Sequence, residues 1–248
     1  MNIHALWCHP RSVSTAFERI MRERGDMSVF HEPFMYHYYL TVSGKPFPDF
    51  VPESGHPVEY AGIRDMILER AETRPVFFKD MAYYVVDDLA EDAAFTGQMS
   101  HAFLLRDPCE AAFSYARKDP EFSLTELGFE AQHRLYHALV EQGHSPLILT
   151  ADQLREEPER TLSRYWKHAG LGFAEHAFSW DDRVPEGWKS VQSWHDEVLQ
   201  SGAIKKPAEV DASAQLAKLG PPYTDYVTHH LSFYTELLDI AEAQAHQK

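Results

Sequence analysis

The sequence contains few cysteines and glycines and too little positive charge for several common classes of protein. Its 248 residues include 2 cysteines and 12 glycines, and 23 Lys and Arg are outnumbered by 38 Asp and Glu, for a formal net charge of −15. Cys8 and Cys109 both lie in segments expected to be buried, which excludes a disulfide framework. The negative charge argues against a general nucleic-acid-binding protein, because such proteins need a basic face for the phosphates.

Long apolar runs are lacking as well. No stretch approaches the run of about 20 apolar residues that a membrane-spanning helix needs. Residues 1–7 have no basic leader and are too short for a signal sequence. We therefore expect a soluble cytoplasmic protein without a membrane span. Such an acidic protein can still bind one small anion, because that requires only a few well-placed cations.

The glycine-rich motifs of ordinary nucleotide-binding proteins are missing near the N-terminus. The first glycine is Gly25 and no lysine precedes Lys45, so neither a Walker A loop nor a Rossmann fingerprint can follow the first apolar segment. Position 14, where a cysteine phosphatase built on Cys8 would need its arginine, is Ser14. The nucleophile elbow of a serine hydrolase is also missing.

The histidines do not form a metal motif of the usual kind. His31 and Glu32 resemble the start of a zinc-protease motif, but the position for its second histidine is occupied by Met35. The 15 histidines are otherwise scattered along the chain without convincing ligand spacing. We therefore predict no metal.

A regular alternation of short apolar and amphipathic segments is present. The apolar segments, predicted as strands, are 3–8, 27–30, 75–78, 101–105 and 146–150. The segments with helical periodicity are 16–21, 59–72, 110–117, 125–142, 158–169 and 223–245. Strands that are apolar on both faces and alternate with helices indicate an α/β three-layer sandwich with a central parallel sheet. No linker divides the chain, so we predict a single domain over residues 1–248, with irregular segments at 41–58 and 172–222.

Polar residues follow the predicted strands at the edge where ligands bind in such sheets. Residues 11–15, Arg-Ser-Val-Ser-Thr, join the first strand to the first helix. A helix N-terminus offers unpaired N–H groups and the positive end of the helix dipole, so this loop predicts an anion site. The alternative is simple capping of the helix by Ser12 or Ser14.

This loop resembles the 5′-phosphosulfate loop of the sulfotransferases that use 3′-phosphoadenosine 5′-phosphosulfate (PAPS). The family loop typically reads Arg-Ser-Gly-Thr/Ser-Thr, and Val13 stands here where many members have glycine. By this resemblance the donor-binding loop consists of Arg11, Ser12, Val13, Ser14, Thr15 and Ala16. The resemblance implies a P-loop NTPase-like sulfotransferase fold, PAPS as co-substrate and adenosine 3′,5′-bisphosphate (PAP) as product.

A second motif carries the same resemblance. The family typically places an arginine at a strand end and a serine eight residues later, both at the 3′-phosphate, and Arg106 and Ser114 have this spacing. Arg106 can bind a phosphate through two N–H groups, and Ser114 can reach the same phosphate from the following helix. The alternative is an Arg106 paired with Asp107 and a Ser114 hydroxyl that bonds to its own helical turn.

Catalytic roles follow from the resemblance together with residue chemistry. Sulfuryl transfer needs charge stabilisation and a base for the acceptor's proton. Glu32 lies where related sulfotransferases have their proposed base, and His31 is the competing base. Lys79 is similar to the lysine that neutralises the bridging oxygen in tyrosylprotein sulfotransferases. The alternatives are a Lys79 paired with Asp80 or Asp87, and a Glu32 that caps a helix or pairs with an arginine of the first helix.

Residues of the C-terminal half could close the donor site. By resemblance, Trp188 offers a stacking face, and Ser201 and Gly202, followed by lysines at 205 and 206, offer a flexible basic loop. The tyrosines at positions 36, 38, 39, 83 and 84 either line the acceptor pocket or belong to the core.

The sequence therefore predicts a sulfotransferase that moves a sulfuryl group from PAPS to a hydroxyl or amine of an unidentified small-molecule acceptor. Two rival functions stay open. One is a nucleotide-dependent kinase or phosphotransferase, against which the missing Walker A lysine counts, and the other is a non-catalytic PAP-binding protein. Because the net charge is −15, we expect a small positive cleft at Arg11, Lys79 and Arg106 and no nucleic-acid partner.

Overall fold

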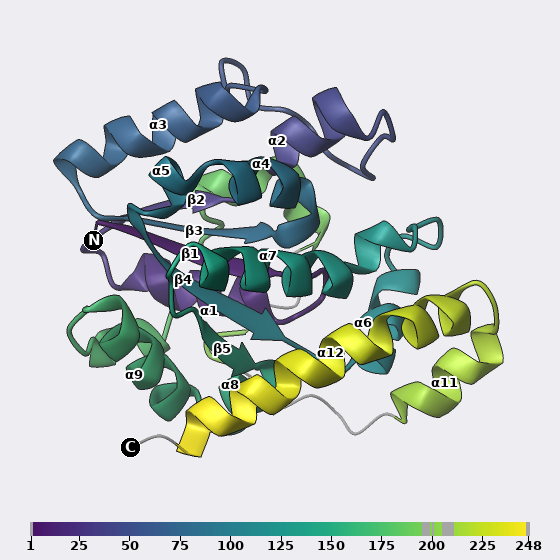
Figure 1. Cartoon of the computed structure of the whole chain (residues 1–248). Coiled ribbons are helices and arrows are strands. Elements are labelled where there is room, and N and C mark those ends of the chain that lie inside the picture. The colour runs from purple at the N-terminus through teal and green to yellow at the C-terminus, as the bar shows by residue number, and fades with distance from the viewer. Residues whose placement is uncertain (1, 195–198, 200, 205–210, 247–248) are drawn as a thin grey trace.

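A five-stranded parallel sheet forms the centre of the molecule (Figure 1). The computed structural model describes residues 2–194, 199, 201–204 and 211–246. The strands are β1 (Ile3–Cys8), β2 (Ser28–His31), β3 (Val76–Met81), β4 (Met99–Leu105) and β5 (Leu147–Thr150), in the spatial order β2-β3-β1-β4-β5. The predicted α/β class and parallel sheet are confirmed, and each predicted strand is present.

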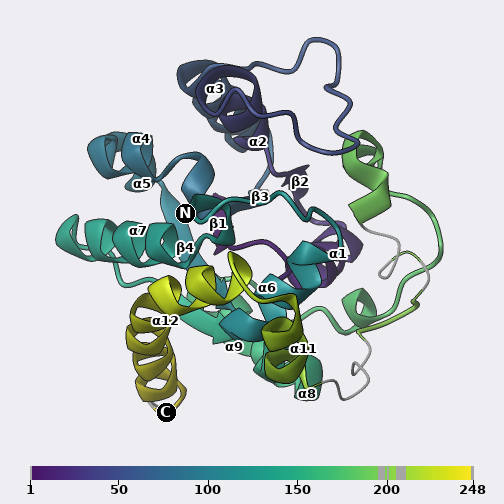
Figure 2. The same cartoon turned by 90° about the vertical axis from the view of Figure 1, so that its right-hand side faces the viewer.

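Helices cover both faces of this sheet and make three layers; in Figure 2, α4, α5 and α7 lie on one side and α1 on the other. The α-helices are α1 (Ser14–Glu23), α2 (Met35–His37), α3 (Tyr60–Thr73), α4 (Val86–Glu91), α5 (Ala93–Thr96), α6 (Pro108–Ala116), α7 (Phe129–Glu141), α8 (Ala151–Glu156), α9 (Pro158–Ala169), α11 (Ala212–Leu219) and α12 (Tyr223–His246). A π-helical turn, η1 (Tyr38–Val42), and four 3-10 segments complete the described elements: η2 (Ala82–Tyr84), η3 (Thr125–Leu127), η4 (Glu175–Phe178) and η5 (Glu186–Trp194).

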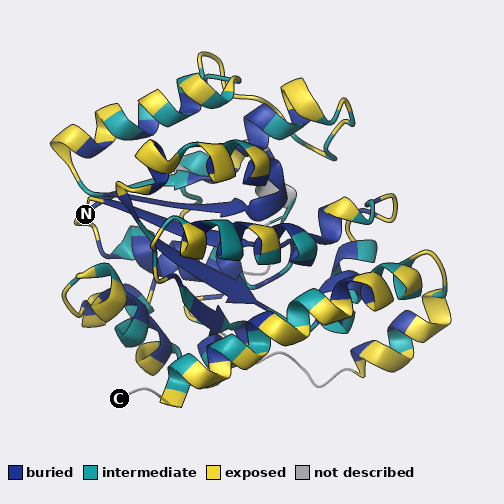
Figure 3. Cartoon of the chain, in the orientation of Figure 1, coloured by how far each residue is buried: buried dark blue, intermediate teal, exposed yellow. Residues whose placement is uncertain are grey.

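Alternation of side chains along the strands decides which residues meet which layer. Phe77 points toward α1, where its ring stacks on Phe17 with centroids 6.1 Å apart. Its neighbour Phe78 points to the other face, where its ring contacts Trp7 at 5.5 Å. Strands β1, β3 and β4 are therefore buried on both faces and drawn dark in Figure 3, whereas the edge strand β2 is mostly half-buried. Burial on both faces explains why the inner strands form nearly continuous apolar runs in the sequence.

Strand β3 extends further than the predicted segment 75–78. Lys79 and Asp80 belong to this strand and are buried, whereas the sequence predicted them just after its end. The strand pairs with β1 over its full length, with Cys8 opposite Met81. Charged residues interrupt the apolar pattern of a strand even when the backbone pairing continues, which explains the short prediction.

The predicted helix over 125–142 is divided at Gly128. This glycine has a φ of 87°, and a Cβ there would lie 3.1 Å from the Cβ of His9. The 3-10 turn η3 therefore ends at Leu127, and α7 begins at Phe129. Within 172–222, which we expected to be irregular, the described residues form α11, η4 and η5.

The carboxyl ends of the strands meet at one edge of the sheet. The chain leaves β1 toward β2 on one side and later reaches β4 on the other side, so β1 lies at a topological switch point. This is the usual place for a ligand in open α/β sheets. The loop after Cys8, the residues after His31, the end of β3 and Arg106 all lie at this edge.

No helix among the described residues is long and apolar enough to span a membrane. Both cysteines are free thiols. Cys8 is buried as expected, whereas Cys109, near the start of α6, is only half-buried.

Candidate functional site

The two main candidates for catalysis, Glu32 and Lys79, contact each other. Lys79 Nζ donates a hydrogen bond to Glu32 Oε1, and the Tyr84 hydroxyl donates to Glu32 Oε2 at 3.1 Å. The Lys79 side chain is 1% exposed and the Glu32 side chain 9%. Lys79 is therefore paired with Glu32, and not with Asp80 or Asp87 as the alternatives from the sequence had it.

Burial disfavours charge on both groups, but their mutual attraction outweighs it. For Glu32, burial raises the pKa, while Lys79 and then His31 lower it, so the pKa of Glu32 lies below its usual range. For Lys79, burial lowers the pKa, and the carboxylates of Glu32 and Glu18 raise it above its usual range. Both residues are therefore charged at neutral pH.

Glu32 also has an unusual backbone conformation. Its φ is 42°, in the left-handed region that residues other than glycine seldom adopt. Its N–H donates to the Lys79 carbonyl at 3.0 Å, and its own carbonyl accepts from Met35 N at 3.0 Å. These bonds hold the strained residue just past β2, and such strain is typical of functional positions.

A second buried carboxylate, Glu18 of α1, joins this cluster and was not predicted. Its Oε2 lies 2.6 Å from His31 Nδ1, and its Oε1 accepts from Arg22 Nε at 2.8 Å and from Trp188 Nε1 at 2.7 Å. Burial opposes the charge, but His31 and Arg22 hold the pKa of Glu18 far below its usual range. Because an ionised carboxylate only accepts, His31 carries a proton on Nδ1 and turns Nε2 toward Glu32, 3.7 Å from its Oε1.

Trp188, expected to offer a stacking face to the nucleotide, is fully buried instead. Its indole N–H donates to Glu18, and its ring meets His31 edge-on with centroids 6.2 Å apart. Trp188 therefore holds the Glu18–His31 pair in place. In the sequence Glu18 lies beside the apolar stripe of Phe17, Ile20 and Met21 and not within it, so helical periodicity gives no signal that Glu18 is buried.

The loop between β1 and α1 has a strained backbone. Arg11 and Val13 have φ values of 64° and 71°. For a β-branched residue such as Val13 this is an outlier, which a glycine at the same place would avoid. Val13 is the N-cap residue of α1 and no side chain caps the helix there, so capping by Ser12 or Ser14 is not observed. Ser12 Oγ is buried and has no hydrogen-bond partner among the described residues.

The remaining residues of the predicted loop lie in the first turn of α1. The helix begins at Ser14, and Thr15 follows it. Ala16 is buried, and its N–H donates to the Val13 carbonyl at 3.1 Å. A helix start without a side-chain cap leaves backbone N–H groups that an anion can accept.

The two predicted donor-binding motifs are joined by hydrogen bonds. Arg11 Nε donates to Ser114 Oγ at 2.9 Å, in place of the alternative in which Ser114 bonds to its own helical turn. Arg106 Nη1 donates to the Arg11 carbonyl at 2.7 Å. The structure therefore brings the loop after β1 together with Arg106, just past β4, and with Ser114 in the last turn of α6.

Arg106 is paired with Glu110, whereas the alternative from the sequence had Asp107 as its partner. Its Nε donates to Glu110 Oε2 at 2.8 Å, whereas Asp107 caps α6 by accepting from Glu110 N at 3.0 Å. Lys79 is likewise paired with Glu32, so Arg106 and Lys79, both expected to contribute to a positive cleft, have carboxylate partners. The cleft that we expected is therefore partly neutralised.

Segment η5 lies over this edge of the sheet, and Trp194 makes its contact with the loop. The Trp194 carbonyl accepts from Arg11 Nη1 at 3.5 Å. Its indole N–H donates to the Pro48 carbonyl at 3.2 Å, and its ring stacks on Phe47 with centroids 4.7 Å apart. The aromatic residue beside the loop is thus Trp194, whereas the sequence singled out Trp188.

The other covering residues lie further along the chain. Ser201 is buried and Gly202 exposed, and the Gly202 carbonyl accepts from Trp180 N at 3.2 Å. The lysines at 205 and 206 lie outside the described residues. A role of Ser201 and Gly202 in donor binding stays a prediction.

The tyrosines considered for an acceptor pocket are largely core residues. Tyr36, Tyr39, Tyr83 and Tyr84 are buried, and Tyr38 is half-buried. The hydroxyls of Tyr39 and Tyr83 lie 3.1 Å apart. Tyr84 differs in that its hydroxyl reaches Glu32.

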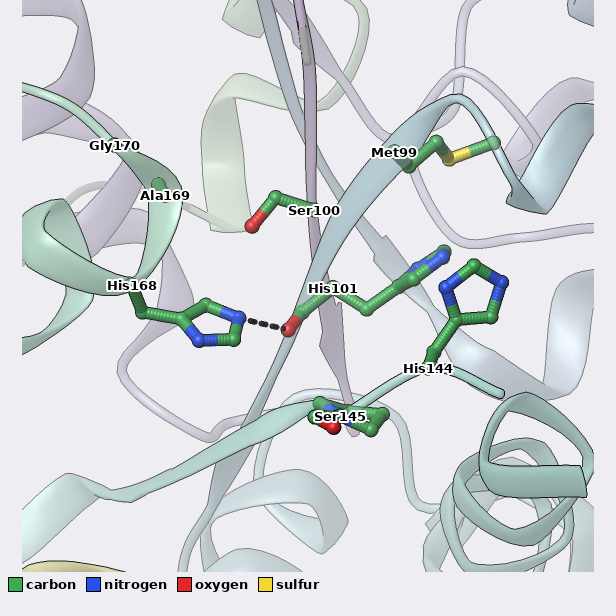
Figure 4. A pocket seen from close by; sticks show the side chains of 9 residues that line it. Met99, Ser100, His101, His144, Ser145, His168, Ala169 and Gly170 are labelled. Carbon is green, nitrogen blue, oxygen red and sulfur yellow. Dashed lines mark hydrogen bonds between the residues drawn. The ribbon is translucent and has the colours of Figure 1, made fainter. Parts of the chain in front are cut away.

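A pocket at the opposite edge of the sheet contains three histidines (Figure 4). It has a volume of about 350 Å³ and is lined by His101, His144 and His168 together with residues at the amino ends of β4 and β5. His101 is fully engaged, since its Nε2 bonds to the Thr96 carbonyl and its Nδ1 accepts from Trp7 Nε1. Because ligands of parallel sheets bind at the carboxyl ends of the strands, this pocket is not the candidate active site.

The chain resembles known proteins in sequence. A family model described as "Sulfotransferase domain" matches residues 1–230. The chain is also 26% identical over 208 residues to the branched-chain-amino-acid aminotransferase-like protein 2 of Arabidopsis thaliana, an alignment that covers 83% of this chain and 36% of that protein. This chain therefore spans little more than a third of that relative's length.

The chain also resembles solved structures. One is the sulfotransferase domain from the curacin biosynthetic pathway, with a TM-score of 0.53 and 12% identity over 93% of this chain and 96% of that one. Another is the sulfotransferase domain of the Synechococcus PCC 7002 olefin synthase, with a TM-score of 0.51 and 16% identity over 88% of this chain and 93% of that one. At these identities the likeness concerns the fold.

Proposed function

The chain belongs to the sulfotransferase domain family, and on this premise we propose that it transfers a sulfuryl group from PAPS to a hydroxyl or amine of a small-molecule acceptor. Its fold is that of sulfotransferase domains, as the sequence predicted. The observation that supports the proposal most is the buried Glu32–Lys79 pair, at the same sheet edge as a loop whose Arg11 bonds to Ser114. A base, an electrophile and an anion site are thereby combined at one edge.

Different elements would bind the two phosphate-bearing ends of the donor. The 5′-phosphosulfate would lie at the start of α1, beside the buried Ser12 hydroxyl that has no partner among the described residues. The 3′-phosphate would lie between Arg106 and Ser114. Arg106 suits this role because a guanidinium binds phosphate oxygens through two parallel N–H groups.

The reaction forms an S–O bond to a hydroxyl acceptor, or an S–N bond to an amine, and breaks the S–O bond to the donor's phosphate. Glu32 takes the acceptor's proton, and it is ready to do so because it is ionised in the free protein. Lys79 turns from Glu32 to the bridging oxygen and stabilises the negative charge that leaves with PAP. The same movement releases Glu32 from its ion pair, so the carboxylate becomes a stronger base when the donor is in place.

His31 and Glu18 would orient this base. Glu18 fixes the His31 ring through Nδ1, and Nε2 then faces Glu32 Oε1 at 3.7 Å. A small movement would bring the two groups within hydrogen-bond distance. His31 can then stabilise the Glu32 carboxylate or receive its proton after transfer.

Calorimetry with the full chain tests the donor site directly. We expect stoichiometric binding of PAP that does not need magnesium, and much weaker binding of ATP with magnesium. A screen of hydroxyl- and amine-bearing metabolites with sulfur-labelled PAPS then tests turnover, and we expect label in at least one acceptor.

The same measurements distinguish the rival functions. Magnesium-dependent ATP binding in place of PAP binding would contradict the sulfotransferase proposal and favour a kinase or phosphotransferase. Tight PAP binding without turnover of any acceptor would favour a non-catalytic PAP-binding protein.

A further inference from the structure

Two histidines and a glutamate meet on the surface where α7 packs against α12 (Figure 1). Glu236 of α12 is shared between the two histidines of α7. Its Oε2 lies 2.9 Å from His133 Nε2, and its Oε1 lies 2.9 Å from His137 Nε2. One ligand atom from each of the three residues lies within 4.8 Å of the others.

Helix geometry explains why the two imidazoles converge. His133 and His137 are four residues apart on α7, so they lie on the same face one turn from each other. Their ring centroids are 4.4 Å apart, and Phe233 of α12 packs on the His133 ring at 5.3 Å. The side chains of His133 and His137 are 20% and 41% exposed, so the site is partly ordered by packing and still open to solvent.

We propose that His133, His137 and Glu236 form a binding site for a divalent transition metal ion such as Zn²⁺. Two imidazoles and a carboxylate are borderline ligands that suit zinc, whereas Mg²⁺ and Ca²⁺ prefer sites made of oxygen. This site goes beyond the proposed function and departs from the sequence prediction of no metal. That prediction passed over the His-x-x-x-His spacing within the expected helix 125–142.

The three ligand atoms have to rearrange within their present side-chain cluster to bind the ion. Tetrahedral zinc has ligands at about 2.0–2.1 Å, which places neighbouring ligand atoms about 3.3 Å apart. The Nε2–carboxylate contacts of 2.9 Å therefore have to open by a few tenths of an ångström, while ligand atoms that lie up to 4.8 Å apart have to close by as much as about 1.5 Å. The metal replaces the Nε2 protons, and each neutral ring keeps a proton on Nδ1. Three protein ligands leave the fourth position to water.

The ion would cross-link α7 to the C-terminal helix α12. Helix α12 also packs against β5 and α6, and α6 carries Ser114 of the proposed donor site. A metal bridge from α7 to α12 would therefore stabilise the layer on which that site depends, without touching the site itself. The net charge of −15 favours binding of a cation at the protein surface.

A matched contact on the same two helices provides a control. His229 Nε2 lies 2.9 Å from Glu130 Oε2, which reproduces one histidine–carboxylate pair between α12 and α7 without a third ligand among the described residues. His229→Gln should therefore leave metal affinity unchanged. His137→Gln and Glu236→Gln should each weaken it about 10-fold or more, because each removes a direct ligand.

The test uses the full untagged chain, stripped of metal with a chelator and titrated with ZnCl₂ by calorimetry and by thermal unfolding. We expect binding of one Zn²⁺ with loss of affinity in H137Q and E236Q, and no response to MgCl₂. At a hundred-fold excess over Kd, zinc should raise the wild-type Tm by about 5–10 °C. Failure of the wild type to bind Zn²⁺, or equal binding by wild type and H137Q, or equal loss in H229Q, would overturn the proposal.

Discussion

At the scale of single residues, the candidate site consists of charges that are buried in pairs. Glu32 pairs with Lys79 and Glu18 with His31, and both acids are ionised despite their burial. Removing one partner of a buried pair leaves an uncompensated charge, which costs more stability than the loss of a surface charge. Substitutions that keep the shape of the side chain are therefore the informative ones here.

Glu32→Gln tests the proposed base. The amide keeps the shape of the side chain and its Oε1 can still accept from Lys79, but it competes less with the donor for this cation, so PAP should bind at least as tightly as to the wild type in calorimetry. The amide cannot take a proton, so turnover should fall by about 10²–10⁴-fold. Glu72→Gln, a change at an exposed position, is the matched control. Full activity of the Glu32 variant would point to His31 as the base, or to no base from the protein.

Asp80 makes the stability of the fold depend on pH. Burial and then the Glu32 charge raise the pKa of Asp80 well above its usual range, and its Oδ2 accepts from Phe34 N at 2.9 Å. The folded state therefore keeps a proton that the unfolded chain releases above a pH of about 3.9. Wild-type stability consequently falls as pH rises above that value, until the folded-state pKa of Asp80 is reached.

Asp80→Asn should remove this pH dependence. Relative to the wild type, its free energy of unfolding should rise by about 1.4 kcal/mol per pH unit within that window. Urea unfolding at a series of pH values measures the difference. Asp182→Asn, at an exposed position, should show no such slope. A constant difference between Asp80→Asn and the wild type at all pH values would show that Asp80 is ionised in the folded protein.

At the scale of elements, the sequence predicted the strands and the residues at their ends, but not all the neighbours of those residues. Glu32, Lys79 and the loop 11–15 were found because carboxyl ends of parallel strands share one edge whatever the details of packing. Glu18 and Trp194 were missed, because one lies inside a helix and the other in an irregular segment. Their positions depend on contacts between segments far apart in the chain.

The division of the predicted helix 125–142 at Gly128 was also missed, because it too depends on a contact with a distant segment of the chain. Helical periodicity continues through residues 125–142, and only the close approach of His9 and the positive φ require a glycine there. Gly128→Ala should therefore lower the free energy of unfolding in urea by about 2–4 kcal/mol, from backbone strain together with the steric contact.

Gly143 provides the control for this prediction. Its φ is 89°, but a Cβ there would meet nothing within 4 Å. Gly143→Ala should cost only the strain of the left-handed conformation, about 1–2 kcal/mol. Equal losses in the two variants would show that the contact with His9 contributes nothing.

At the scale of the whole molecule, a chain with a net charge of −15 has to bind a strongly anionic donor. Lys79 and Arg106 already have carboxylate partners in the free protein. Donor binding must then compete with Glu32 and Glu110 for these cations, so the overall field of the protein cannot supply the affinity. Direct charged hydrogen bonds at the sheet edge have to supply it instead.

The most direct test of this account is the affinity of PAP for Arg106→Ala, measured by calorimetry beside the wild type. Arg134→Ala, which removes a surface arginine bonded to Asp87, is the control. Loss of a charged hydrogen bond of about 1.5–3 kcal/mol predicts an affinity about 10–100-fold weaker than that of the wild type, with a folded protein and an unchanged control. Equal PAP affinity in Arg106→Ala and the wild type would contradict the donor site at the carboxyl edge of the sheet.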